Sequence, residues 1–268
     1  MFSTKLPHRN PQLSDFYMNN RKFIPKVLRP WIEQKIIYAI RPDVYDLYMS
    51  LGENCLPATS LKQVNLRKFS GPFDWIDKSD FQLRVSQIES NFEDALNYED
   101  LLFNLDLRTD RRNNTCSVQN KRTGFVYPHD FEDDSRECFL KQKAKYQRRQ
   151  NRMYSLAKDA NGLFLYADLH SGLQYPDYSP RIEEYCSLLE RLRSKLGMKR
   201  ISLILGVKAA PDSDTQSVDV YEKETLRLFI QPIPEKYLAA TCNMFDWPSV
   251  FLKRALRVAT DYELRTRV

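Results

Sequence analysis

VYDLYMSLGENC, residues 44–55, places a short apolar and aromatic run directly before a glycine. The run from Val44 to Leu51 predicts a buried strand, and Gly52 predicts a tight turn at its end. A helix is expected to follow, because Pro57 is tolerated in a first turn, where its missing N–H costs nothing. Cys55 is therefore expected at the junction of a strand and a helix.

Strands and helices alternate along the rest of the chain. Further buried strands are predicted at residues 163–169, 201–207 and 226–231, and helices at 80–95, 134–158 and 181–196. Parallel neighbours need crossover connections, so this alternation predicts a mostly parallel sheet with helices on both faces, a three-layer Rossmann-like α/β fold. Turn signals around short β-prone pieces predict an inserted hairpin at residues 109–127.

The first 42 residues are expected to stand apart from a single α/β domain at residues 43–268. An extended polar arm is predicted up to about Asn20. A basic amphipathic helix is predicted from Phe23 to Ile36, interrupted near Pro30. One interpretation of this N-terminal helix is that it packs on the flank of the domain. The alternative is contact with an anionic membrane surface or a partner protein.

Composition narrows the class of protein. A chain of 268 residues is close to the size at which single cores stop growing, so one elaborated domain is expected. The net charge of +6 favours anionic partners, but no zinc-finger, RNA-binding or phosphate-loop motif is present, so no nucleic-acid partner is expected. Five separated cysteines without a CxxC pair predict a reducing compartment and no metal site. Without a signal-peptide core or spanning segment, a cytoplasmic location is expected, with the inner membrane face as a variant.

Cys55 is the leading candidate for a reactive group. Ligands of open parallel sheets bind at the carboxyl ends of strands, where helix N-termini lie. Free amides and the helix dipole at Cys55 are expected to stabilise a thiolate and to lower the thiol pKa below about 8.5. The same amides beside Gly52, with the Asn54 side chain, would bind an oxyanion. The alternative is that Cys55 is a small buried hydrophobic residue.

A thiolate enzyme usually needs a base, and the chain has three histidines. His8 lies in the predicted arm and is set aside. His129 is followed by Asp130, whose carboxylate would fix the tautomer of the imidazole and raise its basicity. His170 closes the strand predicted at residues 163–169 and is the alternative base. The sequence does not choose between His129 and His170.

Several motifs resemble those of one known family. SLGENC, LKQVNLRKFSGPFDW, NFEDAL and YPHDF, followed by a basic KYQRR helix, lie between Tyr48 and Leu156. Together they resemble a bacterial family of unknown function that is named for papain-like cysteine peptidases. The resemblance implies that Cys55 is the family's cysteine, that Asp74 is the acid of PFDW, and that His129 and Asp130 are its HD pair. This order looks like that of papain.

The resemblance also implies a second chemistry. Proteins of this kind are often found among surface-polysaccharide genes, and the predicted fold looks like that of an acyl-transferring capsule-biosynthesis protein. Coenzyme A would then be the acyl donor, Cys55 would take or transfer the acyl group to a sugar hydroxyl, and His129 would be the general base. A hydrolase would require no cofactor.

Basic and aromatic residues near the motifs are candidates for substrate binding. Arg148 and Arg152 are four residues apart on the predicted basic helix, so they share a face suited to anionic groups of coenzyme A, a nucleotide sugar or an acidic glycan. Arg67 is a further anion-binding candidate. Trp75 and Asp74 are expected beside Cys55, and the alternative is that they anchor the core and cap a helix.

Two classes of function follow. The first is an enzyme of acyl chemistry, a hydrolase or an acyltransferase, that uses Cys55, His129 and an acid from Asp130 or Asp74. The second is a sugar- or nucleotide-binding accessory protein of polysaccharide assembly that binds anions without turnover. In both, the expected partner is a glycan or another small molecule with anionic groups.

Overall fold

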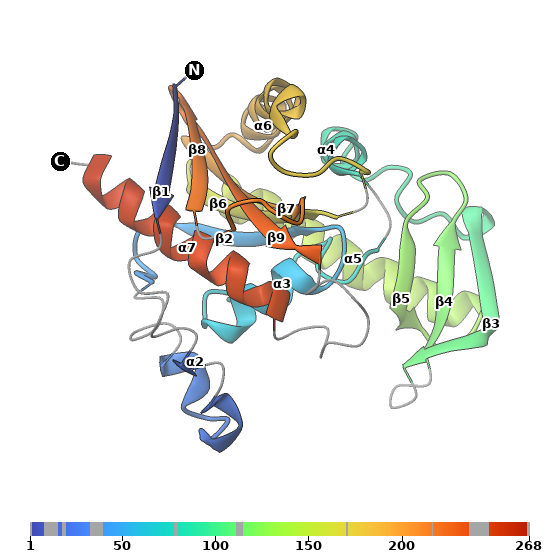
Figure 1. The fold of residues 1–268 in the computed structure, drawn as a ribbon. Helices are drawn as coiled ribbons and strands as arrows, with labels where there is room; N and C mark the ends of the chain where they lie inside the picture. Colours follow the sequence, from blue (N-terminus) through green and yellow to red (C-terminus); the bar gives the residue numbers. More distant parts are fainter. Residues whose placement is uncertain are drawn as a thin grey trace.

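The computed structural model describes residues 2–7, 16–17, 20–32, 40–77, 80–110, 115–169, 171–215, 217–235 and 247–266. These segments form a mixed α/β fold with a six-stranded sheet and a three-stranded sheet (Figure 1). The predicted α/β class with a mostly parallel sheet is therefore confirmed.

The large sheet contains β1 (Phe2–Pro7), β2 (Leu47–Gly52), β6 (Asn161–Asp168), β7 (Arg200–Ala209), β8 (Ser217–Lys223) and β9 (Leu226–Pro234). Their order across the sheet is β1-β8-β9-β7-β6-β2. The four strands β2, β6, β7 and β9 are parallel neighbours. β8 pairs antiparallel with β9, and β1 pairs antiparallel with β8, so β8 alone runs against the other five strands. All six residues of β2 are buried, as expected for a parallel strand covered on both faces.

Helices lie on both faces of this sheet (Figure 1). α3 (Leu56–Gln63) and α7 (Trp247–Thr266) pack on one face, and α4 (Phe81–Glu89) and α6 (Ile182–Leu196) lie on the other. Alternate residues of β6 supply the two cores, because successive side chains of a strand point to opposite faces. Phe164 packs with the α4 and α6 side, and Leu163 and Leu165 pack with the α3 and α7 side.

A three-stranded antiparallel sheet replaces the hairpin predicted at residues 109–127. It consists of β3 (Leu101–Asp110), β4 (Thr115–Asn120) and β5 (Val126–Phe131), paired in that order. The prediction was too short because β3 alternates apolar and polar residues, which is a weaker signal than a continuous apolar run. The basic helix α5 (Arg136–Ala157) packs against β5, and the hydroxyl of Ser135 caps it by accepting from the N–H of Cys138 at 3.1 Å.

The N-terminal segment differs from its prediction. In place of one helix from Phe23 to Ile36, the structure has a 3-10 turn at Arg21–Phe23 and α2 (Arg29–Ile32), while residues 33–39 lie outside the described part. The predicted interruption near Pro30 is wrong, because Pro30 is the second residue of α2, where a first turn tolerates proline. The break lies earlier, at Pro25, because proline removes a backbone donor and disfavours helical geometry in the preceding residue. Four apolar side chains of this segment are exposed, namely Phe23, Val27, Leu28 and Trp31.

Several elements were not predicted as such. Phe2–Pro7, part of the predicted arm, forms the edge strand β1, and neither β8 nor α7 was anticipated. No helix in the described ranges is long and apolar enough to cross a membrane.

Candidate functional site

The junction between β2 and α3 is a sharp turn, as predicted. Gly52 and Glu53 both have positive φ values, +81° and +77°, and Cys55 is the N-cap residue of α3. Glycine adopts such angles freely, whereas a glutamate in them is strained, and strain of this kind gathers at functional sites. A Cβ on Gly52 would lie 2.5 Å from Nη1 of Arg84 and 2.6 Å from the carbonyl oxygen of Phe73, so the turn accepts only glycine.

Hydrogen bonds tie this turn to its neighbours. The carboxylate of Glu53 accepts from the N–H of Leu169 at 2.9 Å, just beyond β6. The backbone of Glu53 forms a parallel bridge with Asp77. Asp77 pairs in turn with Val126, the first residue of β5, through two backbone hydrogen bonds of 2.9 and 3.1 Å. Asp77 therefore links the turn to the strand that carries His129.

The thiol of Cys55 is partly buried, and it is protonated at neutral pH. Burial raises the pKa of Cys55 to about 11, and the carboxylate of Asp77 acts in the same direction. The prediction of a lowered pKa is wrong, because removal of the thiol from water outweighs the field of the helix N-terminus. Catalysis by Cys55 therefore needs a group that accepts its proton.

Two predicted oxyanion donors are engaged in shaping the turn. The N–H of Gly52 donates to Oγ of Ser50 at 3.0 Å, so Gly52 has a structural role and its amide is not free for a ligand. Oδ1 of Asn54 accepts from the N–H of Leu56 at 2.8 Å. Only Nδ2 of Asn54 is left to donate, and its contact with an oxyanion stays a prediction.

His129 is exposed on β5. Its imidazole packs edge-on against Trp75, with ring centroids 6.5 Å apart and an interplanar angle of 82°. Within the described ranges, no hydrogen bond joins the imidazole to the thiol of Cys55 or to a carboxylate. The structure places thiol and imidazole on linked elements without pairing them. The alternative base, His170, lies outside the described residues.

Asp130 does not orient His129, contrary to the prediction. Its buried carboxylate accepts from Nζ of Lys145 and from the hydroxyl of Tyr146, both at 2.5 Å. His129 is exposed whereas Asp130 is buried, because neighbours in a strand point to opposite faces. A pair of adjacent letters, HD, therefore does not give an adjacent pair of side chains.

Asp74 and Arg67 form a buried pair next to Trp75. Asp74 accepts from Nε of Arg67 at 2.8 Å and from the N–H of Gly71 at 3.0 Å. Burial raises the pKa of Asp74 although Arg67 opposes the shift. Arg67 also donates to Ser70 at 2.6 Å, and its guanidinium lies 5.2 Å from the ring of Trp75. The guanidinium of Arg67 is thus already paired with Asp74 and Ser70, and the predicted binding of a substrate anion by Arg67 is not supported.

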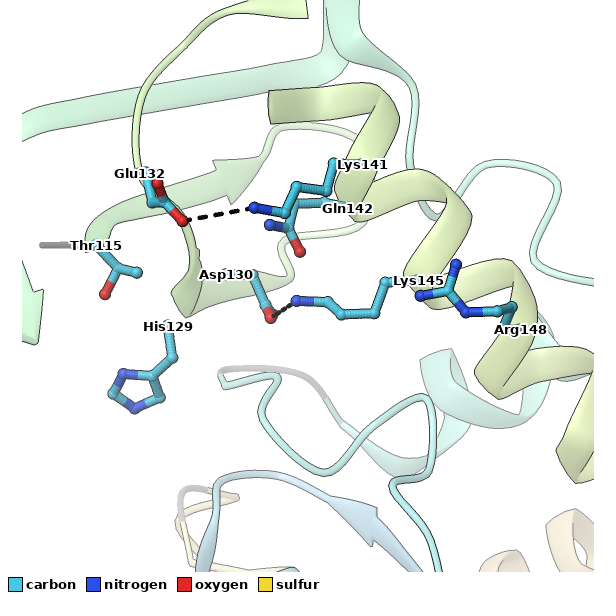
Figure 2. A pocket seen from close by; sticks show the side chains of 8 residues that line it. All are labelled: Thr115, His129, Asp130, Glu132, Lys141, Gln142, Lys145 and Arg148. Atoms are coloured by element: carbon cyan, nitrogen blue, oxygen red, sulfur yellow. Dashed lines mark hydrogen bonds and ion pairs between the residues drawn. The ribbon is translucent and has the colours of Figure 1, made fainter. Parts of the chain in front are cut away.

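A pocket of about 360 Å³ opens between β5 and α5 (Figure 2). It is lined by Thr115, His129, Asp130, Glu132, Lys141, Gln142, Lys145 and Arg148. Arg148 thus shares a pocket with His129. Arg152 does not line it and instead lies 5.8 Å from the ring of Phe69. Cys55 is not among the lining residues either.

Two residues beside the turn, Arg84 and Asp77, were not among the predicted site residues. Arg84 is fully buried, its guanidinium lies 5.1 Å from the ring of Phe73, and two of its three nitrogens have no hydrogen-bond partner in the described part of the chain. Asp77 was missed because it bridges through its backbone, which any residue type provides. No sequence signal separates Arg84 from an exposed arginine on an amphipathic helix. No metal-binding group of three or more His, Cys, Asp or Glu side chains occurs among the residues described.

Residues 46–204 match the family model described as "Putative papain-like cysteine peptidase (DUF1796)". A relative of this chain is the uncharacterized protein R408 of Acanthamoeba polyphaga mimivirus, which is 27% identical over 136 residues. The aligned region is 46% of this chain and 61% of that protein, so the chain spans about three fifths of the relative's length. No solved structure matches the chain.

Proposed function

The chain belongs to the family named for papain-like cysteine peptidases, and from that premise we propose that it hydrolyses peptide bonds with Cys55 as nucleophile and His129 as general base. The observation that carries this proposal is the strained turn at Gly52 and Glu53, which presents Cys55 at the start of α3 and is bridged through Asp77 to β5. Strained strand-to-helix turns present nucleophiles in other hydrolases.

The raised thiol pKa shapes the proposed mechanism. Because the resting thiol is neutral, His129 takes its proton as Sγ attacks the carbonyl carbon, and the carbonyl electrons move to the oxygen. Collapse of the tetrahedral intermediate breaks the C–N bond, and the imidazolium gives its proton to the leaving amine. Water, deprotonated by His129, then attacks the thioester, which releases the carboxylic acid and restores the thiol.

Neighbouring groups prepare this step in the proposal. The ring of Trp75 packs against the imidazole and is itself covered by Arg67, which the buried Asp74 holds. This stack limits the positions that the exposed imidazole can adopt. Nδ2 of Asn54 is the proposed side-chain donor to the oxyanion.

The first test is capture of the acyl-enzyme. The protein is incubated with a peptide library and, separately, with p-nitrophenyl acetate. Each reaction is quenched in acid, and the mass of the intact protein is measured by mass spectrometry. We expect an acyl adduct that disappears in Cys55→Ala and persists in Cys138→Ala, since Cys138 is a second partly exposed thiol on α5. An adduct that survives Cys55→Ala, or no adduct and no cleavage in the wild type, would refute the nucleophile.

Acyl transfer is the competing hypothesis, and the same assay separates it. Acetyl-coenzyme A replaces the peptides, and a Cys55-dependent acetyl adduct without peptide cleavage would replace the peptidase proposal by a transferase. Cleavage of peptides, with no adduct from acetyl-coenzyme A, supports the peptidase.

A further inference from the structure

The pocket between β5 and α5 has features that the proposed chemistry at Cys55 does not use. Three of its cationic side chains come from one face of α5, at Lys141, Lys145 and Arg148, because residues three and four apart are neighbours on a helix. Figure 2 shows them directed toward β5, which contributes His129 and Asp130. The volume of about 360 Å³ suits a small group.

Among the described residues, one cationic side chain of the pocket has no acidic partner. Lys145 is paired with the buried Asp130 at 2.5 Å, and Lys141 is loosely paired with Glu132 at 3.8 Å. Arg148 has no acidic partner in the described ranges. One surplus positive charge matches a singly charged carboxylate better than a phosphate monoester, which carries about 1.5 to 2 negative charges at neutral pH.

Gln142 supplies the second observation. Gln142 is 5% exposed and lines the pocket. Its side-chain Oε1 has no hydrogen-bond partner among the described residues. A buried acceptor without a donor is destabilising, so a group that brings an N–H or O–H into the pocket would be favoured. Figure 2 shows this amide in the space between Lys141 and Asp130.

We propose that this pocket binds the free carboxylate and adjacent amide N–H of a peptide C-terminal residue, which makes the protein a carboxypeptidase. The carboxylate accepts from Arg148, with Lys141 and Lys145 nearby, and the N–H donates to Oε1 of Gln142. The binding claim stands on the pocket alone, whereas the activity rests on the proposed function. In this proposal His129, which also lines the pocket, is the base that acts on the last peptide bond.

The binding claim is tested on Cys55→Ala, which cannot turn over substrate. Four probes are titrated by calorimetry: N-acetylglycine, acetate, N-acetylglycinamide and inorganic phosphate. We expect N-acetylglycine to bind about tenfold more tightly than N-acetylglycinamide, which lacks the charge, and about fivefold more tightly than acetate, which lacks the N–H. Phosphate that binds more tightly than N-acetylglycine, or four equal affinities, would overturn the proposal.

Variants assign the contacts. Arg148→Gln should weaken N-acetylglycine about tenfold. Gln142→Leu should remove the advantage of N-acetylglycine over acetate while the melting temperature holds or rises, because an unpaired buried acceptor is lost. Lys143→Gln is the matched control, since Lys143 is on the same helix and does not line the pocket. Equal weakening by Lys143→Gln would show a general charge effect and contradict the pocket.

Failure of the two proposals can be told apart. Binding of N-acetylglycine without any acyl adduct in the wild type would refute the peptidase and leave the carboxylate site in place. Cleavage of internal peptide bonds that Arg148→Gln leaves unchanged would refute the carboxypeptidase and leave the peptidase in place. Release of C-terminal residues that depends on both Cys55 and Arg148 would support both.

Discussion

The turn at residues 52–55 and the pocket between β5 and α5 are built in opposite ways. Backbone geometry makes the turn, with two residues at positive φ, and its polar groups are satisfied by near neighbours. Side chains from β4, β5 and α5 line the pocket, which includes a surplus cation and a buried acceptor without a partner among the described residues. In the two proposals above, the turn fixes the position of a reactive group and the pocket recognises a ligand.

The largest expected effect tests the rigidity of the turn. Gly52→Ala should lower the free energy of unfolding by about 4 kcal/mol, because it adds a left-handed alanine and a clash with the carbonyl of Phe73. Gly124→Ala, in the turn between β4 and β5, has a similar φ of +70° but no atom within 4 Å of the new Cβ, so only about 1 kcal/mol of strain is expected. Urea unfolding measures both, and equal losses would contradict the steric account.

The next effect compares two buried carboxylates, Asp74 near the turn and Asp130 in the pocket. Asp74→Ala should lower the free energy of unfolding by about 3 kcal/mol, because it leaves the charge of Arg67 without its partner in a side chain that is only 14% exposed. Asp130→Ala should cost less, about 2 kcal/mol, because Lys145 is 28% exposed and can reach water, although the Tyr146 hydroxyl loses its acceptor. Urea unfolding of both variants is the measurement, and the reverse order would refute this ranking.

The third effect concerns the thiol. A cysteine pKa raised to about 11 keeps Cys55 neutral, so its alkylation by iodoacetamide should increase with pH up to a midpoint near that value. At pH 8.5 we expect a rate about a hundredfold below that of a free cysteine peptide, since only the thiolate reacts. Peptide mapping by mass spectrometry follows Cys55 separately. A midpoint below neutral pH would instead show that the thiolate is stabilised.

The smallest effect is expected on the pocket rim. Lys141→Gln should change the free energy of unfolding by less than about 0.5 kcal/mol, because its ion pair with Glu132 is long and both side chains are exposed. Thermal unfolding at low and high salt provides the check. A loss of more than about 1 kcal/mol would mean that the pocket is part of the stabilising structure, as the turn is.

The parallel strands could be predicted and several other elements could not, for one physical reason. Strands buried on both faces are continuous apolar runs, so β2, β6, β7 and β9 were expected close to their observed positions. Helix α7 is rich in charged residues, yet Lys253 and Arg254 are almost fully buried. A charged residue indicates an exposed face by default, and only the surrounding structure reveals an exception.

The candidate site divides in the same manner. Cys55 became the candidate nucleophile because strand, glycine and helix are contiguous in the chain. The few histidines left His129 and His170 as candidate bases, and the family resemblance favoured His129. The partners of Asp130 and Asp74 were not foreseen: Asp130 binds Lys145 and Tyr146 on a helix further along the chain, and the buried Asp74 is bound by Arg67.

The sequence by itself determined the strand, the left-handed turn and the helix that place Cys55 at a sheet edge, because these depend on local backbone preferences and apolar runs. Tertiary structure alone decided that the thiol is neutral, that Asp130 binds Lys145 and Tyr146, and that Gln142 has an acceptor without a partner among the described residues. Burial and long-range contact control desolvation and pairing, and neither is encoded in the spacing of residues along the chain.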